Sequence, residues 1–238
     1  MREKQCWNQK RFQSLISRSG TFVSPFLRPD PQNPKRQGAF GDLLSDIKLI
    51  FSPLVFSKIW GWVIYRCTYS SDRDWADLMS RLGFYIQESL QQQNGLDMME
   101  SLDYYVLEDK ALFDAAKPAT VREHFRQRVR DAPQHERSVP AMRSQRYNFC
   151  VYIDEDALQS IVSGPPPPGD ELDTGYVNLI CLDMLGGVRA EFDTDHTQLD
   201  RCWIRVTYQD LMPTWYINFR TQRSWFVEYR RPLQVATP

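Results

Sequence analysis

The chain has 238 residues, of which 42% are hydrophobic and 13% aromatic, enough for a sizeable core and too aromatic for a low-complexity or collagen-like chain. No apolar run approaches the roughly 18 residues that span a bilayer, so we expect a soluble, cytoplasmic protein. The balance of 29 basic and 30 acidic residues argues against a nucleic-acid partner and against an anionic membrane surface.

Residues 1–40 differ in charge from the rest of the chain. They hold eight basic and two acidic residues, whereas 41–238 hold 21 basic and 28 acidic residues. The segment also contains four prolines, which oppose continuous helix and strand. We predict a disordered basic tail over 1–40 and a single α+β domain over 41–238. An arginine-rich, acid-poor tail also fits a mitochondrial transit peptide, which stands as the minority alternative.

The first expected elements lie between residues 42 and 108. Apolar residues at helical spacing within 42–56 predict a short helix. The run 60–69 (WGWVIYRCTY) is dense in β-branched and aromatic residues, which favour a strand. Ser71 then begins a capping-box pattern and an apolar stripe, so a helix should follow. A second strand over 102–108 completes a β-α-β unit.

The second half repeats this plan without a repeat at the level of residues. The expected elements are a charged helix over 120–131, a strand over 146–153, a helix over 157–162 capped by Asp154, a strand over 176–183, and further strands over 202–208 and 224–229 with a short helix or loop between them.

Two successive β-α-β units predict an α+β fold, specifically a ferredoxin-like split βαβ-βαβ with an inserted helix and extra C-terminal strands. The inserted helix is the one expected over 120–131. A doubly wound α/β sheet is the alternative. It would need longer crossover helices, and strands composed mainly of valine and isoleucine rather than of aromatic and polar residues.

The runs WGWVIYR (60–66), RYNFCVYIDEDAL (146–158) and YVNLICLD (176–183) resemble a broad group of uncharacterised proteins from filamentous fungi. The resemblance covers about residues 58 to 219. It implies a eukaryotic intracellular protein, in some members an accessory to specialised metabolism. The shared motifs are strands and helix caps, so they carry no catalytic residues to this chain.

Sequence patterns of several chemistries are absent. The chain has no GxGxxG, no GxxxxGK[ST] loop, no GxSxG elbow and no CxxC pair. Asp193, Asp195 and His196 gather oxygen and nitrogen donors, but without a second ligand set an acidic surface loop is the better interpretation. We therefore predict no metal and no cofactor. The strand over 146–153 lacks the glycine of an RNA-recognition motif, which disfavours RNA binding.

Five cysteines are scattered along the chain, mostly within strand-like runs. They are Cys6, Cys67, Cys150, Cys181 and Cys202. Their odd number and wide spacing predict buried, reduced thiols rather than a disulfide framework.

The first functional hypothesis is a non-enzymatic interaction or accessory protein. Its aromatic-rich sheet surface would bind a protein partner or a second copy of the chain, more readily than nucleic acid. The candidate contact residues are Trp62, Tyr65, Tyr104, Tyr105 and Tyr152.

The second hypothesis is a cofactor-free enzyme of the isomerase, cyclase or lyase type, with a small-molecule pocket over the sheet. Arg66, Asp103 and Asn148 lie within expected strands, where charged and amide groups are costly unless they are paired or used. A structural salt bridge between Arg66 and Asp103 is the simpler interpretation. The sequence assigns no catalytic residue.

Alternation along the first strand predicts which residues share a face. Trp62, Ile64, Arg66 and Thr68 point one way, and Val63, Tyr65, Cys67 and Tyr69 point the other way. The second set is more apolar and should meet the helices. Arg66 should then line a pocket or an interface on a helix-free side, and Arg66→Ala should cost little folding stability.

Overall fold

The structure is a computed structural model that describes residues 60–135, 145–169, 175–182, 202–219, 222–230 and 234–238. The expected basic tail, the helix expected within 42–56, the cluster at Asp193–His196 and Cys6 lie outside the described residues.

The first β-α-β unit forms as the sequence predicts. Strand β1 (Val63–Arg66) is buried along its whole length. Ser71 caps helix α3 (Asp72–Gln92), because its hydroxyl accepts a hydrogen bond from the backbone N–H of Asp74 at 3.1 Å. The buried residues of α3 recur on one helix face, which packs on the sheet. Strand β2 (Tyr105–Leu107) then pairs in parallel with β1.

The other described elements follow in chain order. They are 3₁₀ turns at Leu96–Ser101 and Gln145–Tyr147, α4 (Lys110–Phe113), α5 (Pro118–His135), β3 (Phe149–Ile153), α6 (Glu155–Val162), β4 (Tyr176–Cys181), β5 (Trp203–Thr207), an irregular helical segment at Leu211–Trp215 that continues into α7 (Tyr216–Asn218), α8 (Gln222–Glu228) and β6 (Val235–Ala236). Asp154 caps α6 as predicted, since its carboxylate accepts a hydrogen bond from the N–H of Ala157 at 2.9 Å.

The described strands form one mixed sheet of six, in the order β2-β1-β3-β4-β5-β6. Strand β1 runs parallel to both β2 and β3, whereas β4 runs antiparallel to β3 and to β5. Strand β6 pairs in parallel with β5. The combination of helices with a mixed sheet confirms the predicted α+β content.

The strand order differs from the predicted ferredoxin-like split arrangement. In a split β-α-β unit another strand separates the two parallel strands, but β1 and β2 are hydrogen-bonded neighbours. The connection from β2 through α5 then places β3 on the other side of β1. The order β2-β1-β3 is that of a doubly wound sheet. With 21 residues, α3 supplies the long crossover helix that this alternative requires.

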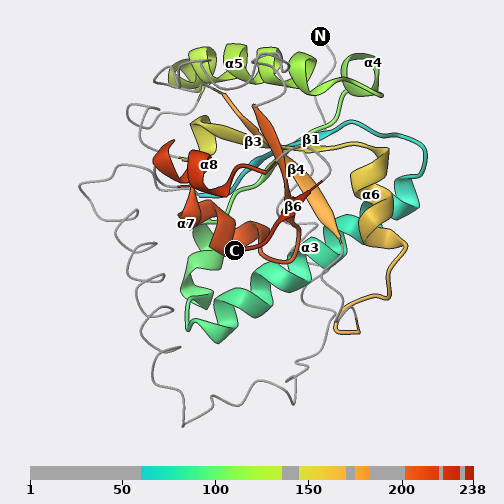
Figure 1. Cartoon of the computed structure of the whole chain (residues 1–238), viewed down its shortest axis with the longest axis vertical. Coiled ribbons are helices and arrows are strands. Elements are labelled where there is room, and N and C mark those ends of the chain that lie inside the picture. The colour runs from blue at the N-terminus through green and yellow to red at the C-terminus, as the bar shows by residue number, and fades with distance from the viewer. Residues whose placement is uncertain (1–59, 136–144, 170–174, 183–201, 220–221, 231–233) are drawn as a thin grey trace.

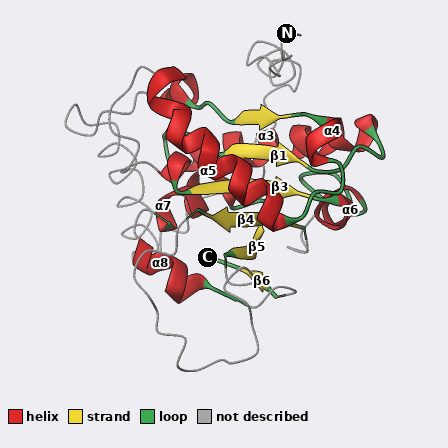
Figure 2. Ribbon diagram, turned by 90° about the horizontal axis from the view of Figure 1, so that it is seen from above, coloured by secondary structure: helices red, strands yellow, loops and turns green. Residues whose placement is uncertain are grey.

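Helices cover both faces of the sheet (Figures 1 and 2). Residues of α3, α6, α7 and α8 share a hydrophobic cluster with Trp62 and Ile64. Residues of α4 and α5 share a second cluster with Val63, Tyr65 and Cys67. The predicted alternation of β1 is therefore confirmed. The predicted helix-free face is wrong, because each set of β1 side chains meets helices.

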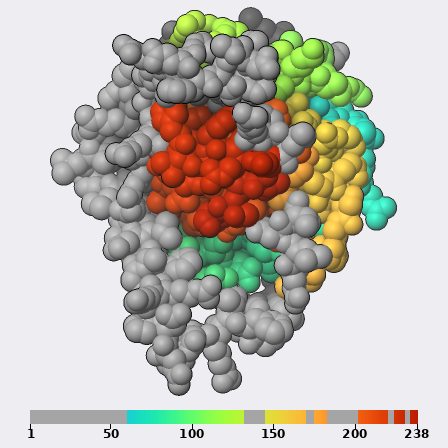
Figure 3. Space-filling model, viewed as in Figure 1, coloured from blue at the N-terminus to red at the C-terminus, as the bar shows by residue number. Residues whose placement is uncertain are grey.

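The C-terminal residues complete the cover over the first of these faces. In the space-filling view of Figure 3 they form the red area at the centre, with α3 below them and α4 and α5 above. Trp215, Tyr216 and Phe219 are almost fully buried in the same cluster as α3. Trp62 lies beneath this segment, and its indole N–H donates a hydrogen bond to the carbonyl of Leu211 at 3.1 Å.

The strand predicted over 224–229 is wrong, since 224–228 belong to α8 and Tyr229 directly follows this helix. The N–H of Tyr229 donates a hydrogen bond to the carbonyl of Trp225 at 2.9 Å, which continues the helical turn, and the two ring centroids lie 6.4 Å apart. Trp225 also stacks on Phe149 of β3 at 5.7 Å. This packing favours the helix over an alternating strand, and β6 takes the edge of the sheet instead.

Gly61 carries a structural requirement just before β1. Its φ of 112° is one that L-residues rarely adopt, and a Cβ there would lie 3.0 Å from the carbonyl oxygen of Asp103. We expect Gly61→Ala to lower the free energy of unfolding by about 2 kcal/mol, measured by urea denaturation. Gly164 is the control, because a Cβ there would meet its nearest neighbour at 3.7 Å. Equal losses for the two alanine variants would contradict the steric argument.

Candidate functional site

The structure does not bring together the binding candidates of the two hypotheses, which include Trp62, Arg66, Asp103, Tyr105 and Asn148. Trp62 is buried in the cluster that contains α3, whereas Tyr105 packs on the opposite face. Asp103 and Asn148 precede β2 and β3, at the amino ends of these strands, and Arg66 ends β1 at the other edge of the sheet. These residues therefore form no common site.

The predicted salt bridge between Arg66 and Asp103 is wrong. The guanidinium of Arg66 pairs with Asp72 at 2.5 Å and with Glu108 at 3.5 Å. It also lies 4.5 Å from the ring centroid of Tyr69 and 5.0 Å from that of Trp75. Its Nε donates a hydrogen bond to the carbonyl of Thr68 at 2.9 Å. Arg66 thus joins the end of β1 to the start of α3 and to the end of β2.

Asp103 has a different partner. Its carboxylate pairs with Arg146 at 3.0 Å. The Arg146 side chain is only 1% exposed and also donates hydrogen bonds to the carbonyls of Gly61 and Asp103. This arginine fastens together the segments that precede β1, β2 and β3, which is a structural role at the amino edge of the sheet.

The candidate aromatic surface is also absent from the described part of the chain. Trp62 and Tyr65 are fully buried, and Tyr152 is 5% exposed. The Tyr65 hydroxyl lies 3.0 Å from Nδ1 of His124, and the Tyr152 hydroxyl donates to the carbonyl of Ala116 at 2.9 Å. Tyr104 and Tyr105 are half-buried against the two hydrophobic clusters. These aromatic side chains serve the core.

A pocket opens instead where β1 and β3 end. The two strands are parallel neighbours, so their carboxyl ends meet at the same edge of the sheet. After β1 the chain continues into α3 and towards β2, whereas after β3 it continues into α6 and towards β4 on the other side. The chain therefore leaves these two parallel strands in opposite directions along the sheet, and in doubly wound sheets ligands bind at such a position. We call this site the carboxyl-end pocket.

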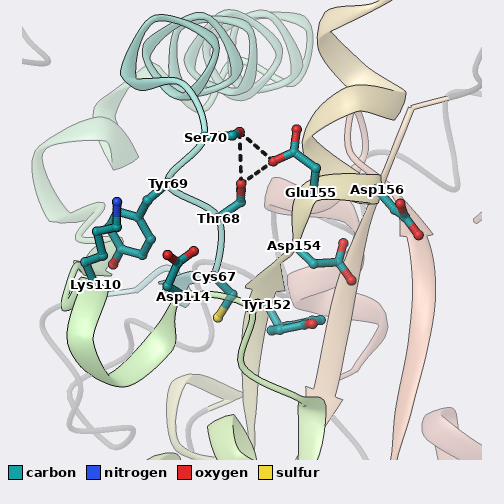
Figure 4. A pocket seen from close by; sticks show the side chains of 11 residues that line it. Cys67, Thr68, Tyr69, Ser70, Lys110, Asp114, Tyr152, Asp154, Glu155 and Asp156 are labelled. Carbon is teal, nitrogen blue, oxygen red and sulfur yellow. Dashed lines mark hydrogen bonds between the residues drawn. The ribbon is translucent and has the colours of Figure 1, made fainter.

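The carboxyl-end pocket has a volume of about 620 Å³, which lies within the roughly 300–1,000 Å³ typical of small-molecule sites. Three segments build it: the residues after β1, the α4 region after β2, and the junction of β3 with α6 (Figure 4). The lining residues are Cys67, Thr68, Tyr69, Ser70, Lys110, Asp114, Ala115, Tyr152, Asp154, Glu155 and Asp156.

Glu155, the first residue of α6, connects two of these segments. One carboxylate oxygen accepts hydrogen bonds from the hydroxyl of Ser70 at 2.6 Å and from the hydroxyl of Thr68. The other oxygen accepts one from Nε2 of Gln159 at 2.9 Å. The bonds from Ser70 and Thr68 lower the pKa of Glu155 below its ordinary value, because they stabilise the charged form. Glu155 therefore carries a negative charge at neutral pH.

Other pocket groups are held in their neutral form. Burial raises the pKa of the Cys67 thiol to about 12, and the carboxylates of Asp154 and Asp114 add to this rise. Burial also raises the pKa of Tyr69 to about 12. Neither group ionises near neutral pH, so neither offers an anionic nucleophile. The four described cysteines are all buried free thiols, which agrees with the sequence-based expectation of burial.

The pocket lining has a negative excess. Four carboxylates, from Asp114, Asp154, Glu155 and Asp156, stand against the single ammonium of Lys110. A concave site with one dominant sign of charge concentrates ions of the opposite sign. No cluster of three or more histidine, cysteine or acidic side chains within the described residues is arranged to hold a metal ion.

The sequence contains a signal for this pocket that the functional hypotheses did not use. Thr68 and Ser70 come directly after the first strand, and the run Asp154-Glu155-Asp156 comes directly after the third. Polar residues that follow parallel strands meet at one edge of a sheet. The inference needed β1 and β3 to run in parallel. In the ferredoxin-like arrangement predicted from the sequence these two strands are antiparallel, so their carboxyl ends would lie at opposite edges of the sheet.

Comparisons with models of protein families, with curated proteins and with solved structures found no match. The interpretation of the pocket therefore depends on its geometry and charge. Within the described part of the chain, none of the helices combines the length and the apolar composition needed to cross a membrane.

Proposed function

We propose that this chain is a non-enzymatic binding protein that takes a small organic cation into the carboxyl-end pocket. The observation that carries the proposal is the position of an acidic lining at the point where β1 and β3 diverge. A protonated amine satisfies carboxylates by charge-assisted hydrogen bonds, and the hydroxyls around Glu155 keep its carboxylate ionised to accept them.

This proposal keeps the accessory role expected from the sequence but moves the binding site. A partner bound through the aromatic sheet face would need Trp62, Tyr65 or Tyr152 at the surface, and all three are buried. The carboxyl-end pocket is open to solvent and offers charged and hydroxyl side chains to a small ligand. An association with fungal specialised metabolism stays a prediction from the sequence resemblance.

The cofactor-free enzyme is the weaker candidate. A general acid or base works best with a pKa near the operating pH. The pKa of Glu155 is lowered, and those of Cys67 and Tyr69 are raised to about 12, so these shifts move each group away from neutral pH. Groups with a fixed protonation state near neutral pH are better suited to binding a charged ligand than to transferring a proton.

Binding of cadaverine, a flexible diamine, tests the proposal. We expect calorimetric titration of the full chain to show binding, and Glu155→Gln to weaken it about tenfold, because the substitution removes the ionised acceptor. Glu100→Gln is the matched control. Glu100 is exposed near the amino edge of the sheet, outside the pocket lining, so this variant should bind like the unaltered chain.

Two results would contradict the proposed function. One is the absence of cadaverine binding at millimolar concentration. The other is an equal affinity of the Glu155→Gln and Glu100→Gln variants, which would place any binding outside the carboxyl-end pocket.

A further inference from the structure

The charges of the carboxyl-end pocket are distributed unevenly between its walls. Glu155 and Asp156 lie on the α6 side, and Lys110 lies beside Tyr69 on the α4 side across the opening (Figure 4). The Lys110 ammonium lies 6.0 Å from the ring centroid of Tyr69. The α6 wall is therefore negative, whereas the α4 wall carries one positive group, Lys110, and one carboxylate, Asp114.

The charged groups at the two ends are not paired with each other. Lys110 forms no ion pair with any described residue, although Asp114 follows it by one helical turn. Asp156 likewise forms no ion pair within the described part of the chain. A single molecule that carries both a positive and a negative group can bind charged side chains of opposite sign on the two sides of one cavity.

We propose, on the basis of the proposed function, that the ligand is an amino-acid-like zwitterion with at least one amine directed to the carboxylates of Glu155 and Asp156 and a carboxylate directed to Lys110. The net negative lining still favours a molecule with more amine than acid groups. Lys110 is then the residue that selects a carboxylated amine over a plain amine of the same length.

Cadaverine and L-lysine test this selection, because L-lysine is cadaverine with one added carboxylate. We expect the full chain to bind L-lysine about fivefold more tightly than cadaverine, the size of one partly exposed ion pair. Lys110→Met keeps the apolar stem and removes the charge. This variant should lose the preference for L-lysine while binding cadaverine at least as tightly as before.

Lys117→Met is the matched control, because Lys117 is exposed and does not line the pocket. It should keep the preference for L-lysine. If cadaverine binds the unaltered chain as tightly as L-lysine does, or if Lys110→Met keeps the preference, the zwitterion is ruled out while the cation pocket stands. If neither probe binds, the proposed function fails and the zwitterion with it.

Discussion

Replacing Trp62 with alanine should lower the free energy of unfolding by about 4 kcal/mol, the size expected for removing a large aromatic side chain from a well-packed core. Trp62 is fully buried. Its ring packs edge-on against Tyr216, with the ring centroids 4.7 Å apart, and against Phe149 at 6.0 Å. Loss of its indole N–H would leave the carbonyl of Leu211 without this hydrogen-bond donor. The alanine would therefore open a cavity beneath the C-terminal segment.

The measurement is urea denaturation followed by fluorescence and circular dichroism. Phe226→Ala is the control, because this large apolar side chain is 40% exposed on α8 and its loss should cost less than about 1 kcal/mol. A Trp62→Ala variant that unfolds at the same urea concentration as the Phe226→Ala variant would contradict the packing described here. A large loss of stability for Trp62→Ala would identify Trp62 as a core residue, whereas a small loss would fit the surface contact residue that the sequence suggested.

The parts of the fold that depend on neighbouring residues could be predicted from the sequence. Ser71 and Asp154 cap α3 and α6 as expected, because a cap needs only a backbone N–H two or three residues away. The alternation of β1 is also as expected, since it follows from strand geometry alone. These features involve short stretches of chain, in which few alternative partners compete.

The parts that depend on distant residues could not be predicted in this way. Asp103 pairs with Arg146, 43 residues away, and nothing in the sequence distinguishes this arginine from Arg66 as a partner. The covering of Trp62 depends on Leu211, 149 residues away. Helix α8 packs Trp225 on Phe149 in the core, although the composition of residues 224–229 alone favours a strand. All three outcomes depend on contacts between residues that lie far apart in the sequence.

The carboxyl-end pocket illustrates the same division. The polar residues that line it are visible in the sequence directly after the first and third strands. What makes them one site is the parallel pairing of β1 with β3, in which Tyr65 lies opposite Tyr152 and Arg66 opposite Ile153. With that register known, Ser70 and Glu155 become neighbours across a crevice, and an acidic helix start becomes a candidate ligand-binding wall.

Arg66→Ala should lower the free energy of unfolding by about 3 kcal/mol, which reverses the small cost expected from the sequence. The side chain is 7% exposed and its partner Glu108 is 23% exposed, so the variant leaves a carboxylate poorly solvated and without its cation. It also removes the cation–π contacts of the guanidinium with the rings of Tyr69 and Trp75. The pair with Asp72 adds little, because that carboxylate is 89% exposed.

Two further variants separate these causes, again by urea denaturation. Arg73→Ala removes an exposed arginine of α3 and should change the free energy of unfolding by less than about 0.5 kcal/mol. Arg66→Lys keeps the charge beside Glu108 but loses the planar fork, so its loss should lie between those of Arg73→Ala and Arg66→Ala. If Arg66→Ala is as stable as Arg73→Ala, Arg66 does not hold the ends of β1 and β2 together, and its burial would have to serve a ligand instead.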